Sequence, residues 1–194
     1  MGDTYEILEE YLGGKRNSTI SNDEACMLSA LVWSAKSKDP STQVGVCFVN
    51  EEGRVISTGY NGTPNDWSDE EFPWENDTAL LGEENTKYPY VIHAEMNGIV
   101  NYNGPISDFK NSTMYVTLFP CVNCAKLIIQ AGIKKVIYLC DTPNTKDNLC
   151  SKILLKKCGV ECIDFKKLKT KTVSEVGLSL NDARTGNIRV KKYI

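Results

Sequence analysis

A helical pattern of apolar residues follows the tetrapeptide Ser21-Asn22-Asp23-Glu24. A serine that precedes a glutamate by three residues, just ahead of an apolar run, is typical of a capping box at a helix N-terminus. The pattern therefore predicts a helix from this point to about Lys38. The residues that recur at helical spacing are expected to pack inward: Met27, Leu28, Leu31, Val32 and Ala35.

Strand and helix patterns alternate along the rest of the chain. Residues 43–50 and 54–60 resemble two strands joined by a turn at 51–53, which predicts a hairpin. Further strand patterns cover residues 113–118, 135–140 and 160–165, and helix patterns cover residues 121–132 and 146–157. This β-α-β-α-β order predicts parallel strands, with helices on both faces of the sheet.

The length of 194 residues predicts a single domain (1–194) with its core at about 20–165. Residues 62–89 form a long insert with little periodicity, and residues 166–194 are a polar, Lys-rich extension to which no role is assigned. No apolar run approaches the ~18 residues of a membrane span, so no membrane partner is expected. Residues 1–12 are acidic and polar, unlike a secretion signal, which predicts a cytoplasmic protein.

The charge distribution argues against a nucleic-acid partner. The net charge is −3, and the stretch from Gly62 to Thr86 carries eight acidic side chains and no Lys or Arg. Such a surface repels a phosphate backbone, whereas nucleic-acid binding proteins present a basic face. Trp67 and Trp74 in the insert could stack on a base, line a subunit contact, or simply anchor the loop on the core.

Two short motifs carry the candidate chemistry, His-Ala-Glu at 93–95 and Pro-Cys-Val-Asn-Cys at 120–124. Together they form the H-x-E…P-C-x-x-C pattern of zinc deaminases. Three protein ligands are the number that a catalytic zinc ion takes, with the fourth position left to water. Glu95 is expected to act as the general acid and base that moves a proton from this water to the substrate. The predicted zinc ligands are His93, Cys121 and Cys124.

Other interpretations of these residues exist. A lone histidine is often a surface residue, a single C-x-x-C can be a redox pair or half of a structural zinc site, and Cys140 could supply a fourth ligand. Both motifs lie at predicted helix N-termini, which favour thiolates, and their joint occurrence favours catalytic zinc. The six cysteines outside the motif are expected to be small, reduced core residues: Cys26, Cys47, Cys140, Cys150, Cys158 and Cys162.

Beyond the motif, four segments resemble deoxycytidylate (dCMP) deaminases: residues 38–45, 59–64, 87–97 and 114–134. They cover roughly half of the chain. The resemblance implies a three-layer α/β/α fold with a five-stranded mixed sheet. It also implies hydrolysis of dCMP to dUMP and ammonia, which supplies thymidylate synthesis. The family further implies a homohexamer that is activated by dCTP with Mg²⁺ and inhibited by dTTP.

The same resemblance assigns nucleotide contacts. Asn61 is expected to hydrogen-bond the sugar 3′-hydroxyl, and the backbone of Ala94 is expected to help hold the pyrimidine ring. Asn61 and Gly62 lie in the loop that family members use around the effector nucleotide. An aromatic residue that often contacts the nucleotide in the family is replaced here by Pro143 or Asn144.

Several rival functions remain. They are a tRNA adenosine deaminase, a single-strand cytosine editor, a free-nucleoside deaminase, a dCTP deaminase and a non-catalytic zinc-stabilised scaffold. The acidic insert argues against the first two. Glu95 argues against the scaffold, because a purely structural zinc site has no use for an unliganded carboxylate. A pocket that holds one phosphate could accept three, so the pattern does not separate dCMP from dCTP.

Overall fold

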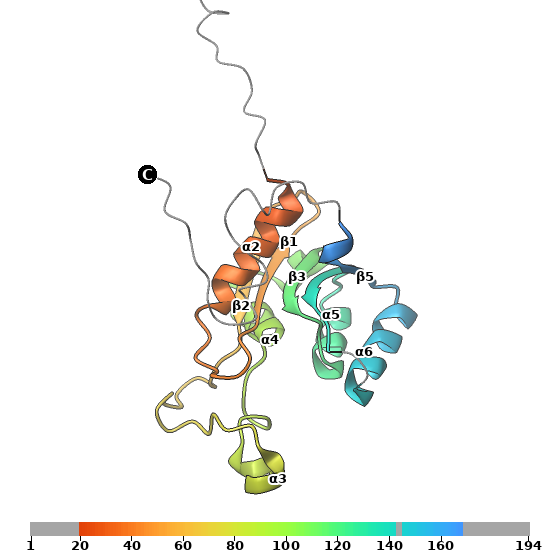
Figure 1. The fold of residues 1–194 in the computed structure, drawn as a ribbon. Coiled ribbons are helices and arrows are strands. Elements are labelled where there is room, and N and C mark those ends of the chain that lie inside the picture. The colour runs from red at the N-terminus through yellow and green to blue at the C-terminus, as the bar shows by residue number, and fades with distance from the viewer. Residues whose placement is uncertain (1–19, 143–144, 169–194) are drawn as a thin grey trace, which may run out of the picture.

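The computed structural model describes residues 20–142 and 145–168, which form one five-stranded mixed sheet with flanking helices. The strands are β1 (Gly45–Val49), β2 (Val55–Tyr60), β3 (Thr113–Leu118), β4 (Lys135–Cys140) and β5 (Glu161–Asp164). They lie in the order β2-β1-β3-β4-β5 (Figure 1). β1 is antiparallel to β2 and β3, whereas β4 is parallel to β3 and β5. The predicted hairpin and parallel strands are confirmed.

The described helices are α2 (Asn22–Ser34), α3 (Thr78–Leu81), α4 (Ala94–Val100), α5 (Val122–Gln130) and α6 (Lys146–Lys157), with 3₁₀ turns at Glu83–Asn85, Ile106–Phe109 and Phe165–Lys167. The capping box of α2 is confirmed, because Ser21 and Glu24 exchange side-chain to backbone hydrogen bonds. This helix ends at Ser34, four residues before the predicted end. Pro40 disfavours helical conformation in the residue before it, and the chain leaves α2 through turns.

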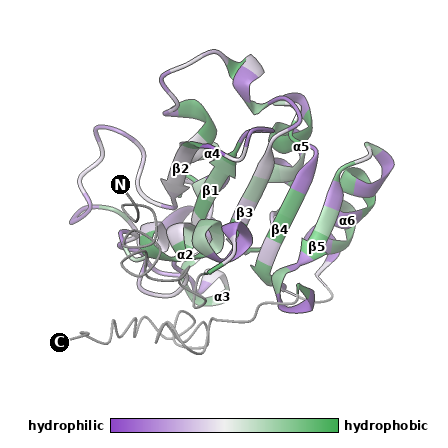
Figure 2. Cartoon of the chain, turned by 90° about the horizontal axis from the view of Figure 1, so that it is seen from above, coloured by the Kyte–Doolittle hydropathy of each residue, from purple (hydrophilic) through white to green (hydrophobic). Residues whose placement is uncertain are grey.

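The helices cover both faces of the sheet, as predicted, but they are unevenly divided. α2 packs on one face, and α4, α5 and α6 pack on the other (Figure 2). Each of α5 and α6 connects one parallel strand to the next in the same direction across the sheet. Because such crossovers are right-handed, both helices come to lie on the same face. The predicted three-layer α/β/α architecture is confirmed.

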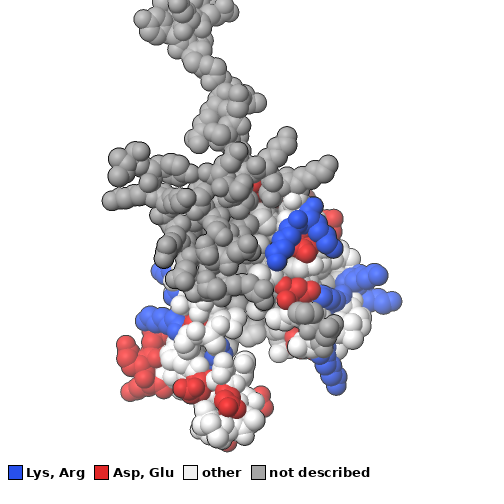
Figure 3. Space-filling view, in the orientation of Figure 1, with Lys and Arg blue, Asp and Glu red and all other residues white. Residues whose placement is uncertain are grey.

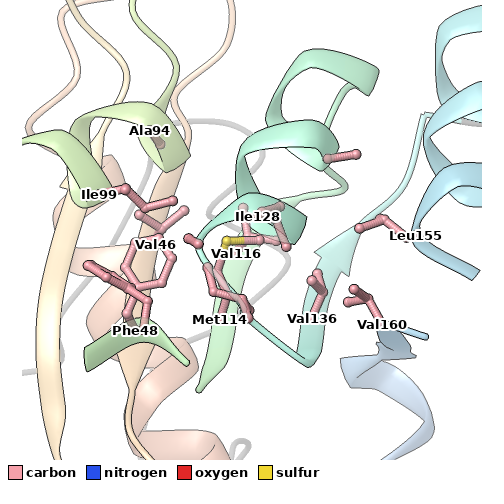
Figure 4. Close-up of a cluster of buried hydrophobic side chains, with 14 of the residues drawn as sticks. Val46, Phe48, Ala94, Ile99, Met114, Val116, Ile128, Val136, Leu155 and Val160 are labelled. Atoms are coloured by element: carbon pink, nitrogen blue, oxygen red, sulfur yellow. The ribbon is translucent and has the colours of Figure 1, made fainter. Parts of the chain in front are cut away.

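The larger hydrophobic core lies between the sheet and helices α4, α5 and α6 (Figure 4). Val46, Val116 and Val136 from three adjacent strands are fully buried there, together with Ile128 of α5 and Leu155 of α6. Each fully buried aliphatic side chain stabilises the fold by roughly 1.5–3 kcal/mol. This core holds the start of α4 and of α5 against the sheet.

The inward face of α2 differs from the prediction. Val32 is 61% exposed and Ala35 is also exposed, so their predicted inward packing is wrong. Met27 and Leu31 do pack inward, and their buried neighbours on the helix are Cys26, Ala30 and Ser34. The C-terminal half of α2 approaches the sheet closely, because a Cβ on Gly45 would lie 2.0 Å from the carbonyl oxygen of Ala30.

The insert is tied to the body of the protein by aromatic contacts. Trp67 packs edge-on against Phe72 and Tyr90, with ring centroids 5.1 and 5.2 Å apart, and Phe72 contacts Trp74. Trp67 therefore ties the insert to Tyr90 just beyond it, whereas the contacts of Trp74 lie within the insert. A role of either ring against a base or a second copy stays a prediction. The tip of the insert, with α3, projects away from the sheet (Figure 1), and the acidic side chains of the insert gather on that side of the molecule (Figure 3).

The cysteines outside the motif divide into two groups. Cys26 and Cys47 are buried and Cys140 is half-buried, but Cys150, Cys158 and Cys162 are exposed. The prediction that all six are core residues is wrong for the last three, which lie on or beside α6 at the edge of the fold. All eight cysteines are free. None of the helices in the described part of the chain is long and apolar enough to cross a membrane.

Candidate metal and nucleotide site

Two helix N-termini bring the predicted metal ligands together. His93 is the N-cap residue of α4, and Cys121 is the N-cap residue of α5. Cys124 lies in the first turn of α5, where its backbone N–H donates to the Sγ atom of Cys121 at 3.4 Å. The free N–H groups of a helix N-terminus stabilise negative charge, so both helices favour anionic sulfur here. The predicted convergence of the two motifs is present.

The three side chains have the spacing of a zinc cradle. Nδ1 of His93 lies 3.4 Å from Sγ of Cys121 and 3.4 Å from Sγ of Cys124. Zinc–sulfur bonds of about 2.3 Å and zinc–nitrogen bonds of about 2.0–2.1 Å at a tetrahedral angle place sulfur and nitrogen roughly 3.5 Å apart. The donor set and the spacing both fit zinc.

The group has three members among the described residues. Its ligand atoms all lie within 4.8 Å of one another, and neither Cys140 nor Glu95 belongs to it. Cys140, considered above as a fourth ligand, instead lines a separate cavity beside Asp141. With three protein ligands, the group has the composition of a catalytic site rather than a closed structural one.

The protons in this group are unevenly shared. Hydrogen bonding from Cys124 and the adjacent imidazole of His93 lower the pKa of Cys121 to about 4, against the opposing effect of burial. Its hydrogen bond with Cys121 raises the pKa of His93 to about 9, and a separate hydrogen bond with Cys121 raises the pKa of Cys124. His93 and Cys124 therefore hold protons that a divalent cation displaces on binding.

Glu95 is the carboxylate nearest to this group. Its side chain is 3% exposed, and burial raises its pKa, while the charge of His93 opposes that rise. A buried carboxyl group with a raised pKa binds a proton more readily than an exposed one, as a group that transfers protons must. The environment of Glu95 is thus suited to proton transfer.

A cavity of about 260 Å³ opens above the group. Its walls are largely apolar and include Val44, Val91 and Phe119, with His93 and Glu95 among the polar residues. An apolar pocket with a few convergent polar groups is the usual form of a small-molecule site. Its size and its apolar walls suit a small planar ring.

The predicted nucleotide-binding residues also reach this cavity. Ala94 is fully buried in its wall, as the first residue of α4, where N–H groups have no intrahelical acceptor. Asn61 lines the same wall, and its side chain bonds the loop before β1 through Thr42 and Val44. Pro143 and Asn144, noted above in place of an aromatic residue, lie outside the described residues.

Gly62 faces a different cavity. It lines a polar cavity of about 500 Å³, together with Trp33 and Tyr60, whose rings are stacked 6.2 Å apart. The Lys36 ammonium lies 5.3 and 5.4 Å from the two ring centroids. Asn61 and Gly62 are consecutive, so one short loop separates the two cavities.

The sequence interpretation missed a buried ion pair in the wall of the metal-site cavity. Lys87 and Asp39 contact each other there at 2.7 Å, with side chains 4% and 2% exposed. Both residues lie in segments that carried the resemblance, 38–45 and 87–97. Their position in these segments was the sign in the sequence that the two residues lie near the site. Without it, charged residues are expected on the surface.

Comparisons with known proteins agree with this geometry. The family model described as "Cytidine and deoxycytidylate deaminase zinc-binding region" matches residues 20–140. The deoxycytidylate deaminase of Mus musculus is 44% identical over 160 residues, covering 82% of this chain and 88% of the relative. That of Homo sapiens is 41% identical over 169 residues, covering 81% and 93%.

A solved structure is similar over much of the fold. The crystal structure of dCMP deaminase from the cyanophage S-TIM5 in complex with dCMP and dUMP superposes with a TM-score of 0.55 at 30% identity. The match covers 73% of this chain and 95% of the cyanophage chain. The resemblance inferred from the sequence is confirmed, and the family match includes the complete metal group.

Proposed function

The chain belongs to the family of cytidine and deoxycytidylate deaminases, and we propose that it hydrolyses dCMP to dUMP and ammonia, supplying dUMP for thymidylate synthesis. The observation that carries this function is the buried Glu95 beside a three-ligand group at the end of an apolar cavity. A structural zinc site has no use for such a carboxylate. The mouse and human relatives, which this chain matches over most of their length, are deoxycytidylate deaminases.

The zinc cradle is His93, Cys121 and Cys124, and zinc bound there supplies Lewis-acid activation of a water molecule. Glu95 takes a proton from the attacking water and delivers it to N3 of cytosine, which makes C4 more electrophilic. After water has added at C4, Glu95 moves a proton to the departing amine. The raised pKa of Glu95 suits a group that must both accept and donate a proton.

The remaining contacts orient the nucleotide. The backbone N–H of Ala94 holds the pyrimidine ring, and Asn61 accepts a hydrogen bond from the sugar 3′-hydroxyl. Both residues line the cavity that contains Glu95. The apolar walls exclude bulk water from the ring, which strengthens each polar contact inside.

Regulation uses the second cavity. dCTP with Mg²⁺ activates the enzyme and dTTP inhibits it, both by binding beside Gly62. The support for this site is its size, the aromatic pair of Trp33 and Tyr60, and the Lys36 ammonium over that pair. Lys38 in the same wall is paired with Asp69. Because Asn61 borders the substrate cavity and Gly62 the effector cavity, one loop connects the two sites.

The enzyme works as a homohexamer in the cytoplasm. Exposed Met96 and Val100 on the outer side of α4 support a contact between copies, since they leave 38% and 69% of their surface uncovered. Eight free cysteines fit a reducing compartment.

One experiment tests the function directly. The purified protein is incubated with dCMP, dCTP, CMP and deoxycytidine, and ammonia release is measured with and without added dCTP or dTTP. We expect dCMP to give the highest kcat/KM, with activation by dCTP and inhibition by dTTP. Equal turnover of deoxycytidine would instead identify a nucleoside deaminase, and preferred turnover of dCTP would identify a triphosphate enzyme.

A further inference from the structure

Asp39 and Lys87 form an ion pair inside the wall of the substrate cavity. They are 48 positions apart, and Nζ of Lys87 lies 2.7 Å from each carboxylate oxygen of Asp39. Burying two charges removes their hydration, and their mutual attraction often fails to offset that cost, so a buried pair is weak evidence of stability. Stability alone therefore does not explain why this ion pair lies in the cavity wall.

The ammonium of Lys87 is fully engaged. Its three N–H groups are directed at the two oxygens of Asp39 and at the hydroxyl of Ser41. Lys87 thus has no donor left for a nucleotide phosphate, although it lines the cavity. Its charge serves to hold the Asp39 carboxylate in place.

Asp39 in turn reaches Asn61. One oxygen of Asp39 accepts from the backbone N–H groups of Ser41 at 2.9 Å and Thr42 at 3.0 Å. The other oxygen accepts from Nδ2 of Asn61 at 3.3 Å. The carboxylate therefore connects the loop after α2 with the side chain of Asn61, which is proposed to contact the sugar.

These contacts allow only one orientation of the Asn61 amide. The backbone N–H of Val44 can only donate, and it lies 2.8 Å from Oδ1. The Asp39 carboxylate and the carbonyl oxygen of Thr42, the latter at 2.9 Å, can only accept, so both face Nδ2. Both N–H groups of Asn61 are then used, and only a lone pair on Oδ1 is left for a ligand.

We infer that Asp39, held by Lys87, is a positioning residue that presents Asn61 as a hydrogen-bond acceptor and so makes the site selective for nucleotides with a free 3′-hydroxyl. The inference rests on the proposed function, in which Asn61 meets this hydroxyl. A nucleotide that lacks the hydroxyl leaves the second lone pair of Oδ1 without a donor in a buried site, which is costly. When the amide is displaced, this selectivity weakens.

The matched variant is Asp39→Asn with Lys87→Met, called here the pair variant. Removing both charges leaves no unpaired ion behind. An asparagine at position 39 still accepts from Ser41 and Thr42 through its oxygen, but it presents an N–H group to Nδ2 of Asn61. Two donors then face each other and displace the amide of Asn61, while the backbone groups of Val44 and Thr42 still favour its orientation.

Selectivity is measured by binding and by turnover. Calorimetry compares dUMP with 2′,3′-dideoxyuridine monophosphate, and kcat/KM compares dCMP with 2′,3′-dideoxycytidine monophosphate. We expect the wild type to prefer the hydroxyl-bearing nucleotide by about tenfold or more. In the pair variant the ratio should fall by at least about threefold, chiefly through KM. In an Asn61→Ala background the pair substitutions should cause no further loss of selectivity, because Asp39 acts through Asn61.

A control removes an ion pair elsewhere. Lys135 and Glu161 lie 3.3 Å apart on the surface, where β4 and β5 begin. Lys135→Met with Glu161→Gln should keep the wild-type ratio, because these residues touch neither cavity.

The outcomes are distinct. A folded pair variant with the wild-type ratio overturns the inference. Absence of dCMP turnover by the wild type overturns the proposed function instead. In that case the binding of dUMP relative to 2′,3′-dideoxyuridine monophosphate still tests the role of Asp39. If the pair variant does not fold, a crystal structure of the wild type with dUMP decides: Oδ1 of Asn61 should accept from the 3′-hydroxyl. An amide that turns so that Nδ2 donates to the nucleotide would overturn the inference.

Discussion

Gly59 of β2 and Gly98 of α4 lie against each other with no room for a side chain between them. A Cβ on Gly59 would lie 2.6 Å from the backbone nitrogen of Gly98 and 2.5 Å from the carbonyl oxygen of Ala94. This contact seats α4 directly on the sheet, and α4 begins immediately after His93. The position of the metal-binding imidazole therefore depends on two glycines that touch no ligand.

Gly59→Ala should disturb both the fold and the metal site. Its Cβ would meet backbone atoms that cannot move aside without shifting α4, and overpacking of this kind costs about 1–3 kcal/mol. We expect a lower free energy of unfolding in urea and a lower zinc content per chain. Gly62→Ala is the control, since the nearest atom to its Cβ would be 3.8 Å away. Equal losses in the two variants would contradict this explanation.

The metal group was predictable because its geometry is local. Cys121 and Cys124 share one helical turn, and His93 directly precedes a helix, so the spacing in the sequence fixes most of the arrangement. The strands β3 and β4 were equally predictable from the sequence, because each contains a short run of apolar, mostly buried residues. These features need no knowledge of distant contacts.

Other features depend on contacts that no local pattern contains. The burial of Asp39 requires Lys87 from the far end of the insert, and without that partner a charged residue is expected on the surface. Val32 is exposed because the buried stripe of α2 runs through Met27, Ala30, Leu31 and Ser34 at helical spacing, and Val32 lies off it. Cys150 occupies the outer side of α6, which also exposes Leu149, so apolar character alone does not identify the buried face.

Glu95→Gln should separate chemistry from metal binding. The substitution keeps the size of a buried side chain but removes the group that moves the proton, so kcat should fall by about 10²–10⁴-fold. Because Glu95 is not part of the ligand group, zinc measured by elemental analysis should stay at the wild-type level. Glu161→Gln on the surface provides the control. Turnover within a few-fold of the wild type would remove Glu95 from the proposed role.

Cys124→Ser should act on the metal first. A serine hydroxyl is a poor ligand for zinc compared with a thiolate, so zinc content should drop together with activity. Cys158→Ser, at an exposed cysteine beyond α6, should change neither quantity. If the Cys124 variant kept its full zinc content, Cys124 would lie outside the metal coordination sphere.

The Asp39–Lys87 pair should make the protein sensitive to acid. Burial raises the pKa of Asp39, but hydrogen bonds from Lys87 and from the backbone of Thr42 and Ser41 outweigh it, and the pKa of this carboxyl lies below its ordinary value. A carboxyl group with a lowered pKa contributes stability that is fully present above its unfolded pKa of about 3.9. That contribution is lost as the pH falls through the folded pKa.

The free energy of unfolding, measured in urea between about pH 6 and pH 3, should therefore fall more steeply in the wild type than in the pair variant. The difference in slope is at most that of one proton, about 1.4 kcal/mol per pH unit, because only Asp39 is removed as an acidic group. The pair variant keeps the remaining carboxylates, so it isolates this one titration. Parallel curves would mean that Asp39 binds as many protons in the folded as in the unfolded state over this range, and that Lys87 does not lower its pKa.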